Sequence, residues 1–286
     1  CNSNESYLFE YCPDMLSSSE VFTIFRCNDC GFIFTQDSPD EDLIDKYYKS
    51  QNYISHHNSK NLFGRIYNMV RSWMGKKKIR LIKRHKKGKN LNLLDIGCGQ
   101  GHFLKDARKK KFEVTGIEKS ESTRNRAKEE FGLTIEAPAF IREIKDKSMD
   151  VVTLWHSLEH IHDLHGTMKQ IHRILKDDGI VVLALPNMNS LDAKHYGIYW
   201  AGYDAPRHLW HFNPKTLKAL AEKHHFEVIK TKRMPFDAFY ISILSEKNKK
   251  SASPSLKGMI FGLKSFFKSR KNIHLASSVI YILKKK

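Results

Sequence analysis

The chain has 286 residues, of which 41% are hydrophobic, and a formal net charge of +18 at pH 7. This length accommodates one large α/β domain with a small additional module, and the sequence has no run of about 18 apolar residues that would indicate a membrane span. The strong positive charge argues against an ordinary small-molecule enzyme and favours contact with nucleic acid, anionic lipid or an acidic substrate, unless the basic runs are simply solvated helix faces.

The first predicted element is a small module at residues 1–40 that is marked by cysteines. Cys27-Asn28-Asp29-Cys30-Gly31 is a C-x-x-C-G turn, a spacing at which two thiolates bind one metal ion. A four-ligand zinc site needs a second pair, of which Cys1 is a candidate member whose own partner would precede the numbered start. The alternative is a pair of buried or oxidised cysteines. An odd number of cysteines, five, and the lack of a visible secretory signal predict a reducing, cytoplasmic location.

A helical lead-in is predicted over residues 41–90. Its first part, Asp42–His57, is rich in tyrosines that can pack between the two modules. Its second part, Lys60–Lys87, places apolar residues at helical spacing and therefore predicts an amphipathic helix. The strongly basic run Lys76–Lys89 lies mostly in this helix.

The most informative segment is Leu93–Gly101, in which an apolar run and one acid precede three alternating glycines. It predicts a buried strand, a glycine turn that lets a ligand approach the backbone, and a helix over Gly101–Lys111. A dinucleotide-binding loop would require a glycine where His102 stands, and a phosphate-binding loop would require a basic residue followed by Ser or Thr. A strand–helix turn without a ligand is the alternative.

Strands and helices alternate through the rest of the chain, which predicts a parallel sheet with helices on both faces and a ligand at the carboxyl ends of the strands. Glu118 ends the second strand about 20 residues after the first glycine, where a nucleotide fold places its ribose-binding carboxylate; a helix-capping role is the alternative. The predicted strands are Phe112–Glu118, Leu133–Ile135, Asp150–Trp155, Gly179–Leu185, Phe226–Lys232 and Ser277–Leu283, and the predicted helices are Ser120–Phe131, Asp163–Lys176 and Asn213–His225.

The D-x-G-x-G-x-G pattern from Asp95 to Gly101 resembles the first motif of the class I S-adenosylmethionine-dependent methyltransferases. The resemblance implies an α/β, Rossmann-like domain over residues 91–286, with six parallel strands, an antiparallel seventh strand and S-adenosylmethionine as cofactor. It implies cofactor-binding roles for residues of the glycine turn and of the following strand ends, namely Asp95, Gly97, Cys98, Gly99, Gly101, Glu118, Trp155 and His156.

The amino-terminal module resembles a zinc ribbon found ahead of some bacterial methyltransferase domains, in which a C-x-x-C pair precedes R-C-x-x-C-G-x-x-F. Arg26–Phe34 matches the second half of that pattern, whereas the first half is incomplete. The resemblance implies a structural zinc ion held by Cys1, Cys27 and Cys30. It also implies that the tyrosine-rich segment folds over the cofactor, with Tyr53 and His56 as candidates.

The segment from His156 to His160 follows the predicted fourth strand and reads H-x-x-E-H. One class of zinc proteases uses this string inside a helix, so its place at a strand exit argues against that function. The segment is similar to the E-x-x-E-H of quinone-biosynthesis O-methyltransferases, which is associated with a divalent cation; Glu159 and His160 match, but His156 replaces the first glutamate. A histidine suits removal of a hydroxyl proton, so His160 and His208 are candidate catalytic residues, with helix capping or packing as alternatives.

The segment Asn187–Phe212, after the fifth strand, is dense in aromatic residues, Arg and His. Its D-x-P-R-H-L-x-x-F string, which begins at Asp204, recurs in this methyltransferase branch. Arg207 is a candidate to hold an acidic acceptor through its planar guanidinium. The alternative is a structural ion pair between Arg207 and Asp204.

A basic insertion at about residues 246–275 separates the last two predicted strands. Apolar residues at helical spacing are surrounded by lysines, which predicts a helix that contacts a membrane surface or covers a greasy acceptor. Packing of this helix on its own domain or on a dimer mate is the alternative.

These features lead to one principal hypothesis, a methyltransferase that methylates a hydroxyl of a small or lipid-linked acceptor. We expect it in the cytoplasm, either free or in peripheral contact with an anionic membrane. Methylation of RNA or protein is a second hypothesis, although the chain has no N/D-P-P-Y string of the kind that adenine- and glutamine-methylating enzymes often carry. A third is a non-catalytic nucleic-acid-binding module on a Rossmann-like scaffold.

Overall fold

The predicted alternation of strands and helices forms one seven-stranded sheet in the computed structural model, which describes residues 1, 3–48, 62–234 and 236–286. Five neighbouring strands run parallel, and β11 is antiparallel to both of its neighbours. This confirms the predicted α/β fold with an antiparallel seventh strand. In spatial order the strands are β10 (Phe226–Arg233), β11 (Ser278–Lys285), β8 (Leu175–Pro186), β7 (Met149–Trp155), β4 (Asn92–Ile96), β5 (Glu113–Ile117) and β6 (Ile135–Glu136).

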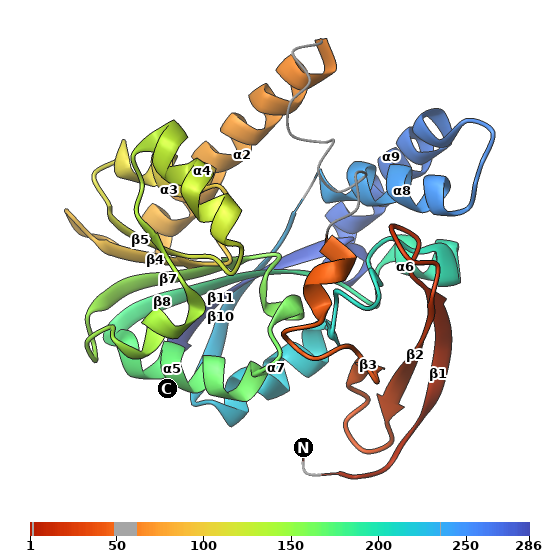
Figure 1. Ribbon diagram of the computed structural model, residues 1–286, viewed down its shortest axis with the longest axis horizontal. Helices are drawn as coiled ribbons and strands as arrows, with labels where there is room; N and C mark the ends of the chain where they lie inside the picture. The colour runs from red at the N-terminus through yellow and green to blue at the C-terminus, as the bar shows by residue number, and fades with distance from the viewer. Residues whose placement is uncertain (2, 49–61, 235) are drawn as a thin grey trace.

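Helices cover both faces of this sheet, as Figure 1 shows. Because successive side chains of a strand point to opposite faces, Leu94 and Val152 pack with one set of helices, while Leu93 and Val151 pack with the other. The first set is α5 (Leu164–Ile174) and α7 (Pro214–Lys223), and the second is α2 (Leu62–His85), α3 (His102–Arg108) and α4 (Glu121–Phe131). Burial on both faces explains why the central strands are almost entirely apolar.

Several predicted elements are present with shifted ends. Ser120 caps α4, as predicted, because its hydroxyl accepts a hydrogen bond from the Thr123 amide. The helix predicted to reach Lys176 ends at Ile174, since β8 already begins at the next residue. The third predicted strand, Leu133–Ile135, lies two residues later, as β6.

The amino-terminal segment forms a second, antiparallel sheet of β1 (Ser6–Pro13), β2 (Val21–Cys27) and β3 (Ile33–Gln36). Its fourth strand, β9 (Trp210–His211), comes from the segment after β8, and pairs with β3. A common core joins the two parts, because residues of the first two strands pack with Trp200 and Tyr203. The boundary predicted at residue 40 therefore separates segments that share a sheet and a core.

The lead-in consists of a short 3₁₀ helix, η1 (Ile44–Tyr48), and the long helix α2. The two residues predicted to cover the cofactor, Tyr53 and His56, lie outside the described residues. The remaining short elements are η3 (Pro138–Arg142), η4 (Leu158–His160), α6 (Leu191–Tyr196), η5 (Gly197–Tyr199) and η6 (Ile273–Leu275).

The predicted basic insertion is a pair of helices rather than one helix. It consists of α8 (Asp237–Asn248) and α9 (Pro254–Lys271), so it begins before the predicted residue 246. The two helices make extensive contact with each other and project from the body of the molecule (Figure 1). Of the helices that the structure describes, none is long and apolar enough to cross a bilayer.

A buried ion pair fastens the second sheet to the main domain. The Arg207 guanidinium donates to Asp14 at 2.8 Å and to Asp204 at 2.7 Å, and the side chains of Arg207 and Asp14 are 1% and 0% exposed. It also donates to the carbonyl oxygen of Tyr47 in η1. One side chain therefore connects the hairpin that ends β1, the lead-in and the segment after β8.

We expect Arg207→Met to lower the free energy of unfolding by about 3–5 kcal/mol, because it leaves the buried Asp14 without its partner. Burial alone would raise the pKa of Asp14, but hydrogen bonds from Arg207 and Ser17 lower it below its usual value. The stabilisation is therefore present above the unfolded pKa and is lost as the pH falls through the folded pKa, so the loss measured by urea unfolding should shrink below about pH 4.

Lys147→Met is the matched control, since it breaks an exposed ion pair with Asp177 and should cost less than about 1 kcal/mol. Equal losses for the two variants at pH 7 would contradict the fastening role of Arg207.

Candidate functional site

The glycine turn leaves β4 at the carboxyl edge of the sheet. The Gly97 amide donates to the Ile117 carbonyl at 2.8 Å, and the Gly99 amide donates to the Glu118 carboxylate at 2.9 Å. Both glycines have positive φ, +70° and +53°, a conformation that favours glycine. A Cβ on Gly97 would lie 2.4 Å from the Ser157 side chain, whereas a Cβ on Gly99 would meet no atom of a described residue within 4 Å. Among the described residues, the turn is thus closed on one side and open at Gly99.

Glu118 ends the adjacent strand β5 beside this opening. One carboxylate oxygen accepts from Gly99, and the other accepts from the Ser120 amide at 3.0 Å. A carboxylate offers about four acceptor positions, so capacity for two hydroxyl donors remains. The Ser120 side chain supplies the helix cap, and Glu118 contacts the start of α4 only through the Ser120 amide.

Two opposite charges, the buried Asp95 and the partly exposed Lys78, lie behind the turn. Asp95 accepts from the Thr153 hydroxyl at 2.6 Å. Burial raises its pKa to about 7, although Thr153 and the positive charge of Lys78 act in the opposite direction. Burial likewise lowers the pKa of Lys78 to about 8, against the attraction of Asp95 and Asp237. Each charge is only partly compensated, as in a site that takes up a charged ligand.

Aromatic rings form the wall next to this charge pair. The Lys78 ammonium lies 4.2 Å from the centre of the Trp155 ring, and Phe103 packs edge-on against the same ring. The Trp155 indole N–H is buried and donates to no described residue. An unpaired buried donor, two carboxylates and an accessible glycine backbone together fit a ligand with ribose hydroxyls and a zwitterionic end.

Cys98, the remaining predicted cofactor residue of the turn, packs into the sheet. A Cβ on Gly116 of β5 would lie 2.8 Å from the Cys98 sulfur, so the thiol fills space that Gly116 leaves free. Burial raises the pKa of this thiol. Gly101, at φ +75°, packs similarly close to Leu133 and Ile135. The Cys98 side chain and the missing Cβ of Gly101 thus shape the turn, and the predicted contact of these two residues with a cofactor stays a prediction.

His156 follows β7 in a left-handed conformation, at φ +55°. Its Nε2 lies 3.0 Å from the carboxylate of Asp237, the first residue of α8, and its Nδ1 lies 3.6 Å from Glu159. Burial alone would lower the pKa of His156, but the two carboxylates, Asp237 above all, raise it to about 10. The imidazole is therefore charged at neutral pH and connects the strand exit to the helical hairpin.

Glu159, His160 and His208 converge in a second cluster. One ligand atom from each lies within 4.8 Å of the others. Glu159 is fully buried, and neither carboxylate oxygen has a hydrogen-bond partner among the described residues. Burial raises its pKa, but His156 and the two clustered histidines lower it further, so the carboxylate is ionised.

The tautomers of the two clustered histidines follow from their partners. Nδ1 of His160 lies 3.0 Å from the Arg207 carbonyl, and Nδ1 of His208 lies 2.9 Å from the Gly202 carbonyl. A carbonyl oxygen can only accept, so each Nδ1 carries a proton. In His160 the Tyr48 hydroxyl also lies 3.0 Å from Nδ1, and Nε2 is the basic nitrogen, whereas Nε2 of His208 lies 3.9 Å from the Asp204 carboxylate. Burial and the neighbouring His208 lower the pKa of His160 to about 4, which leaves it neutral at physiological pH.

Arg207 does not occupy the place predicted for an acceptor ligand. Its guanidinium is buried and donates to Asp204, Asp14 and the Tyr47 carbonyl, as described above. The geometry matches the alternative of a structural pair with Asp204. Its main-chain carbonyl, not its side chain, reaches the histidine cluster.

Three of the five cysteines meet at the end of the second sheet. The Cys1 sulfur lies 3.5 Å from Cys27 and 3.3 Å from Cys30. Backbone hydrogen bonds from the turn, chiefly that of Cys30, lower the pKa of Cys27. Cys12 stands apart in the core between β1 and the segment after β8, where burial raises its pKa to about 12.

Two residues of the site, Lys78 and Asp237, are not predicted from the sequence. Lys78 is one lysine in a long basic run, and only its position three and four residues before the buried Leu81 and Ile82 hints that it faces inward. Asp237 reaches His156 through tertiary packing that no local pattern encodes.

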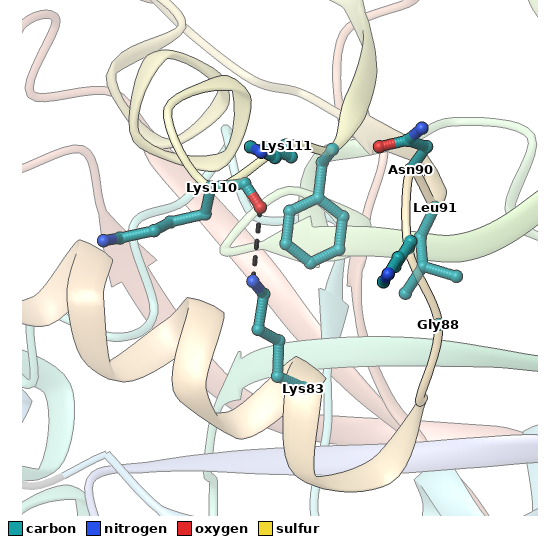
Figure 2. A pocket seen from close by; sticks show the side chains of 8 residues that line it. Lys83, Gly88, Asn90, Leu91, Lys110 and Lys111 are labelled. Carbon is teal, nitrogen blue, oxygen red and sulfur yellow. Dashed lines mark hydrogen bonds between the residues drawn. The ribbon is translucent and has the colours of Figure 1, made fainter.

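Two surface hollows lie away from the glycine turn. One, of about 370 Å³, lies at the amino end of β4 and is lined by lysines, with Lys83 donating to the Lys110 carbonyl (Figure 2). The other, of about 350 Å³, lies between α2 and β10, and reaches the site only through Lys78.

Comparisons with known proteins agree with this geometry. Residues 69–231 match the family model described as a methyltransferase domain. The ubiquinone biosynthesis O-methyltransferase of Pelagibacter ubique is 27% identical over 168 residues, which are 52% of this chain and 67% of that protein. The mitochondrial arginine-hydroxylase NDUFAF5 of Danio rerio is 33% identical over 96 residues, which span 32% of this chain and only 30% of that protein.

Solved structures share the fold. A SAM-dependent methyltransferase from Archaeoglobus fulgidus superposes with a TM-score of 0.51 at 22% identity, covering 75% of this chain and 94% of the other. A phosphoethanolamine N-methyltransferase 2 from Haemonchus contortus, in complex with S-adenosyl-L-methionine, gives a TM-score of 0.55 at 17% identity and covers 98% of this chain and 68% of the other.

Proposed function

The chain belongs to the S-adenosylmethionine-dependent methyltransferases of class I, and on this premise we propose that it methylates a hydroxyl of a small or lipid-linked acceptor. The observation that carries the donor site is the Glu118 carboxylate, bonded to the amide of an otherwise open Gly99. The curated O-methyltransferases among its relatives support the hydroxyl, although their identity is low.

Each part of the proposed donor site has a distinct task. Glu118 accepts from the ribose hydroxyls, and the glycine turn, with Gly97, Gly99 and Gly101, admits the donor to the backbone. Asp95 pairs with the amino group and Lys78 with the carboxylate at the amino-acid end. Trp155 lies along that end and offers its unpaired N–H.

When bound, S-adenosylmethionine supplies an already activated methyl group, so the protein has to align the acceptor and remove its proton. We assign the proton acceptor to His160, whose Nε2 is unprotonated. Its pKa of about 4, with the charge of Glu159 already acting on it, makes His160 a weak base, so it accepts the proton only as the methyl group is transferred. His208 positions the acceptor.

A structural zinc ion on Cys1, Cys27 and Cys30 is a separate proposal for the second sheet. Sulfur separations of 3.3 and 3.5 Å are close to those around a tetrahedral zinc ion with Zn–S bonds of about 2.3 Å. The described residues bring three thiols together at this point.

Calorimetry on three donor analogues tests the donor site. Glu118→Ala and Gly99→Arg should each weaken S-adenosylhomocysteine binding by about tenfold or more, because one removes a charged acceptor and the other fills the opening.

Lys78→Met should weaken the binding of S-adenosylmethionine and S-adenosylhomocysteine similarly but leave the binding of 5′-methylthioadenosine, which lacks the amino-acid end, unchanged. Lys77→Met is the control, since that ammonium lies over Trp73 instead. Equal losses for all three ligands would remove Lys78 from the carboxylate subsite.

Label transfer tests the acceptor class and the base. Incubation of cell extract with methyl-labelled donor should place label in a nuclease- and protease-resistant, solvent-extractable fraction; loss of label with nuclease or protease would favour RNA or protein.

His160→Asn should lower the rate of methyl transfer by about 10²–10⁴ while donor affinity stays unchanged. His172→Asn, a partly buried histidine packed on Phe226, should not.

The pH dependence follows from the same histidine. Because its pKa lies near 4, the base form dominates from about pH 5 upward, so the wild-type rate should be flat between pH 6 and 8 and fall only in acid. Loss of activity on chelation, restored by a divalent cation, would instead indicate a metal ion on Glu159, His160 and His208.

Metal analysis tests the cysteine cluster. We expect about one zinc per chain, lost in Cys27→Ser and Cys30→Ser. Cys12→Ala is the control, because that thiol lies in a separate core and should leave the zinc content unchanged. Metal-free wild-type protein with full thermal stability would contradict the proposal.

A further inference from the structure

In the hairpin of α8 and α9, small residues of α9 are buried and many of its large apolar residues are exposed, which is the reverse of the usual arrangement. Gly258 and Gly262 of α9 are buried against α8, whereas Ser265 donates to Asp192 of α6 and Phe261 packs on Tyr196 of α6. Five other large apolar side chains of α9 point outward, between 48% and 64% exposed, and these are Leu256, Met259, Ile260, Leu263 and Phe267. A helix of a water-soluble domain normally buries its large apolar face.

The small residues form a seam along which two backbones touch. A Cβ on Gly258 would lie 2.5 Å from the Ile243 Cα, and a Cβ on Gly262 would lie 2.8 Å from the Phe239 Cα. The α8 residues that face the two glycines are Ile243 and Phe239, and Gly262 also approaches the Ala238 carbonyl. Glycines four residues apart let two helix backbones approach closely, as they do in helices that pack against each other in lipid.

The lysines of α9 lie at the border of the outward apolar face. Lys257, Lys264, Lys268 and Lys271 repeat at helical spacing, next to the apolar stripe and away from the buried seam. All four are exposed. This is the distribution of a helix that lies in the plane of an interface, with its apolar face in the acyl layer and its ammonium groups at the head groups.

A basic groove of about 350 Å³ continues this surface between α2 and β10. Five of the cations that line it form no ion pair with any described acidic residue, and these are Lys77, Arg80, Arg84, Lys232 and Arg233. Their mutual repulsion is visible in Lys77 and Lys232, whose pKa values are lowered first by burial and then by neighbouring cations. Such a cluster is complementary to an anionic surface.

Direct contacts join the groove to the hairpin. Arg233 of β10 donates to the Phe266 carbonyl of α9 at 3.0 Å and lies over the Phe266 ring. Trp73 of α2 packs edge-on against Phe236, the residue before α8. In Figure 1, the hairpin projects past the sheet on the side that α2 covers. The groove therefore adjoins the hairpin that carries the apolar face.

We propose that the α8–α9 hairpin and this basic groove dock together on an anionic lipid bilayer, with the hairpin lying in the interface plane. The docking itself rests only on the exposed side chains and charges of this surface. Its role in presenting a lipid-linked acceptor rests on the proposed function. That role has a structural basis, because Asp237 at the start of α8 pairs with His156 at the edge of the donor site.

Vesicle sedimentation tests the docking. Wild-type protein should pellet with phosphatidylcholine vesicles that contain about one-third phosphatidylglycerol, and far less with pure phosphatidylcholine. The double variant Ile260→Ser, Leu263→Ser should reduce the partition coefficient by about tenfold or more, because it removes apolar groups that would enter the acyl layer. Val21→Ser with Leu43→Ser is the matched control, since these side chains are similarly exposed, at 62% and 60%, but lie outside the hairpin.

A second pair of variants separates the groove from the general positive charge of the chain. Arg84→Glu with Lys232→Glu should weaken binding about tenfold or more, whereas Lys89→Glu with Lys110→Glu, in the lysine-lined pocket of Figure 2, should change it much less. The two double variants have the same net charge. Equal losses for both, or no loss for the hairpin variant, would overturn the proposal.

Two further measurements identify other occupants of the surface. Concentration-dependent dimerisation that the hairpin variant abolishes would assign the apolar face to a second copy of the chain and overturn the proposal. RNA binding that competes with vesicles and is lost in the groove variant would do the same. Calorimetry with S-adenosylhomocysteine keeps the conclusions separate, because the hairpin variant should bind this ligand like the wild type even where it no longer pellets.

Discussion

The parallel register of β4 between β5 and β7 is the constraint on which the site depends. Asp95 pairs across to Gly116 on one side and to Thr153 on the other. This register brings three chain exits to one edge of the sheet, and the glycine turn, Glu118 and Trp155 follow from it. A side chain at position 116 would collide with Cys98 and Leu104, so the missing Cβ of Gly116 lets the turn and α3 settle against β5.

The edge of the sheet carries polar groups that the fold alone would not retain. Three features cost folding free energy: the displaced pKa values of the buried Asp95 and the partly exposed Lys78, the buried Trp155 N–H, and the buried Glu159 carboxylate, of which the last two have no hydrogen-bond partner among the described residues. These polar groups lie near the carboxyl ends of the central strands, whereas the core clusters on the two faces of the sheet are apolar. Polar groups without full compensation, gathered at one edge, distinguish a ligand site from a strand–helix turn that binds nothing.

The sequence predicted what depends on local periodicity. Short apolar runs between helical segments specify the strands of the main sheet, Ser120 specifies the start of a helix, and the spacing of the glycines specifies the turn. It could not predict contacts between distant segments, such as Arg207 with Asp14, β9 with β3, or Asp237 with His156. The sequence showed the apolar stripe of α9 but not that the stripe is exposed. The buried side of this helix consists largely of Gly and Ser, which a search for hydrophobic periodicity does not detect. The domain boundaries and the site roles beyond the cofactor class stay predictions.

The His156–Asp237 ion pair connects the outward-facing hairpin to the edge of the donor site. It joins a left-handed residue at the exit of β7 to the first turn of α8, and its charge persists because each partner stabilises the ionised form of the other. The Lys78 ammonium interacts with both Asp95 and Asp237, so the amino-acid end of the donor site and the base of the hairpin share one set of charges. Any ligand that changes this charge balance on one side must change the affinity on the other by the same factor. Under the proposed docking, a bilayer surface and a zwitterionic donor would be coupled through three partly buried side chains, Lys78, His156 and Asp237, rather than bind as independent properties of one fold.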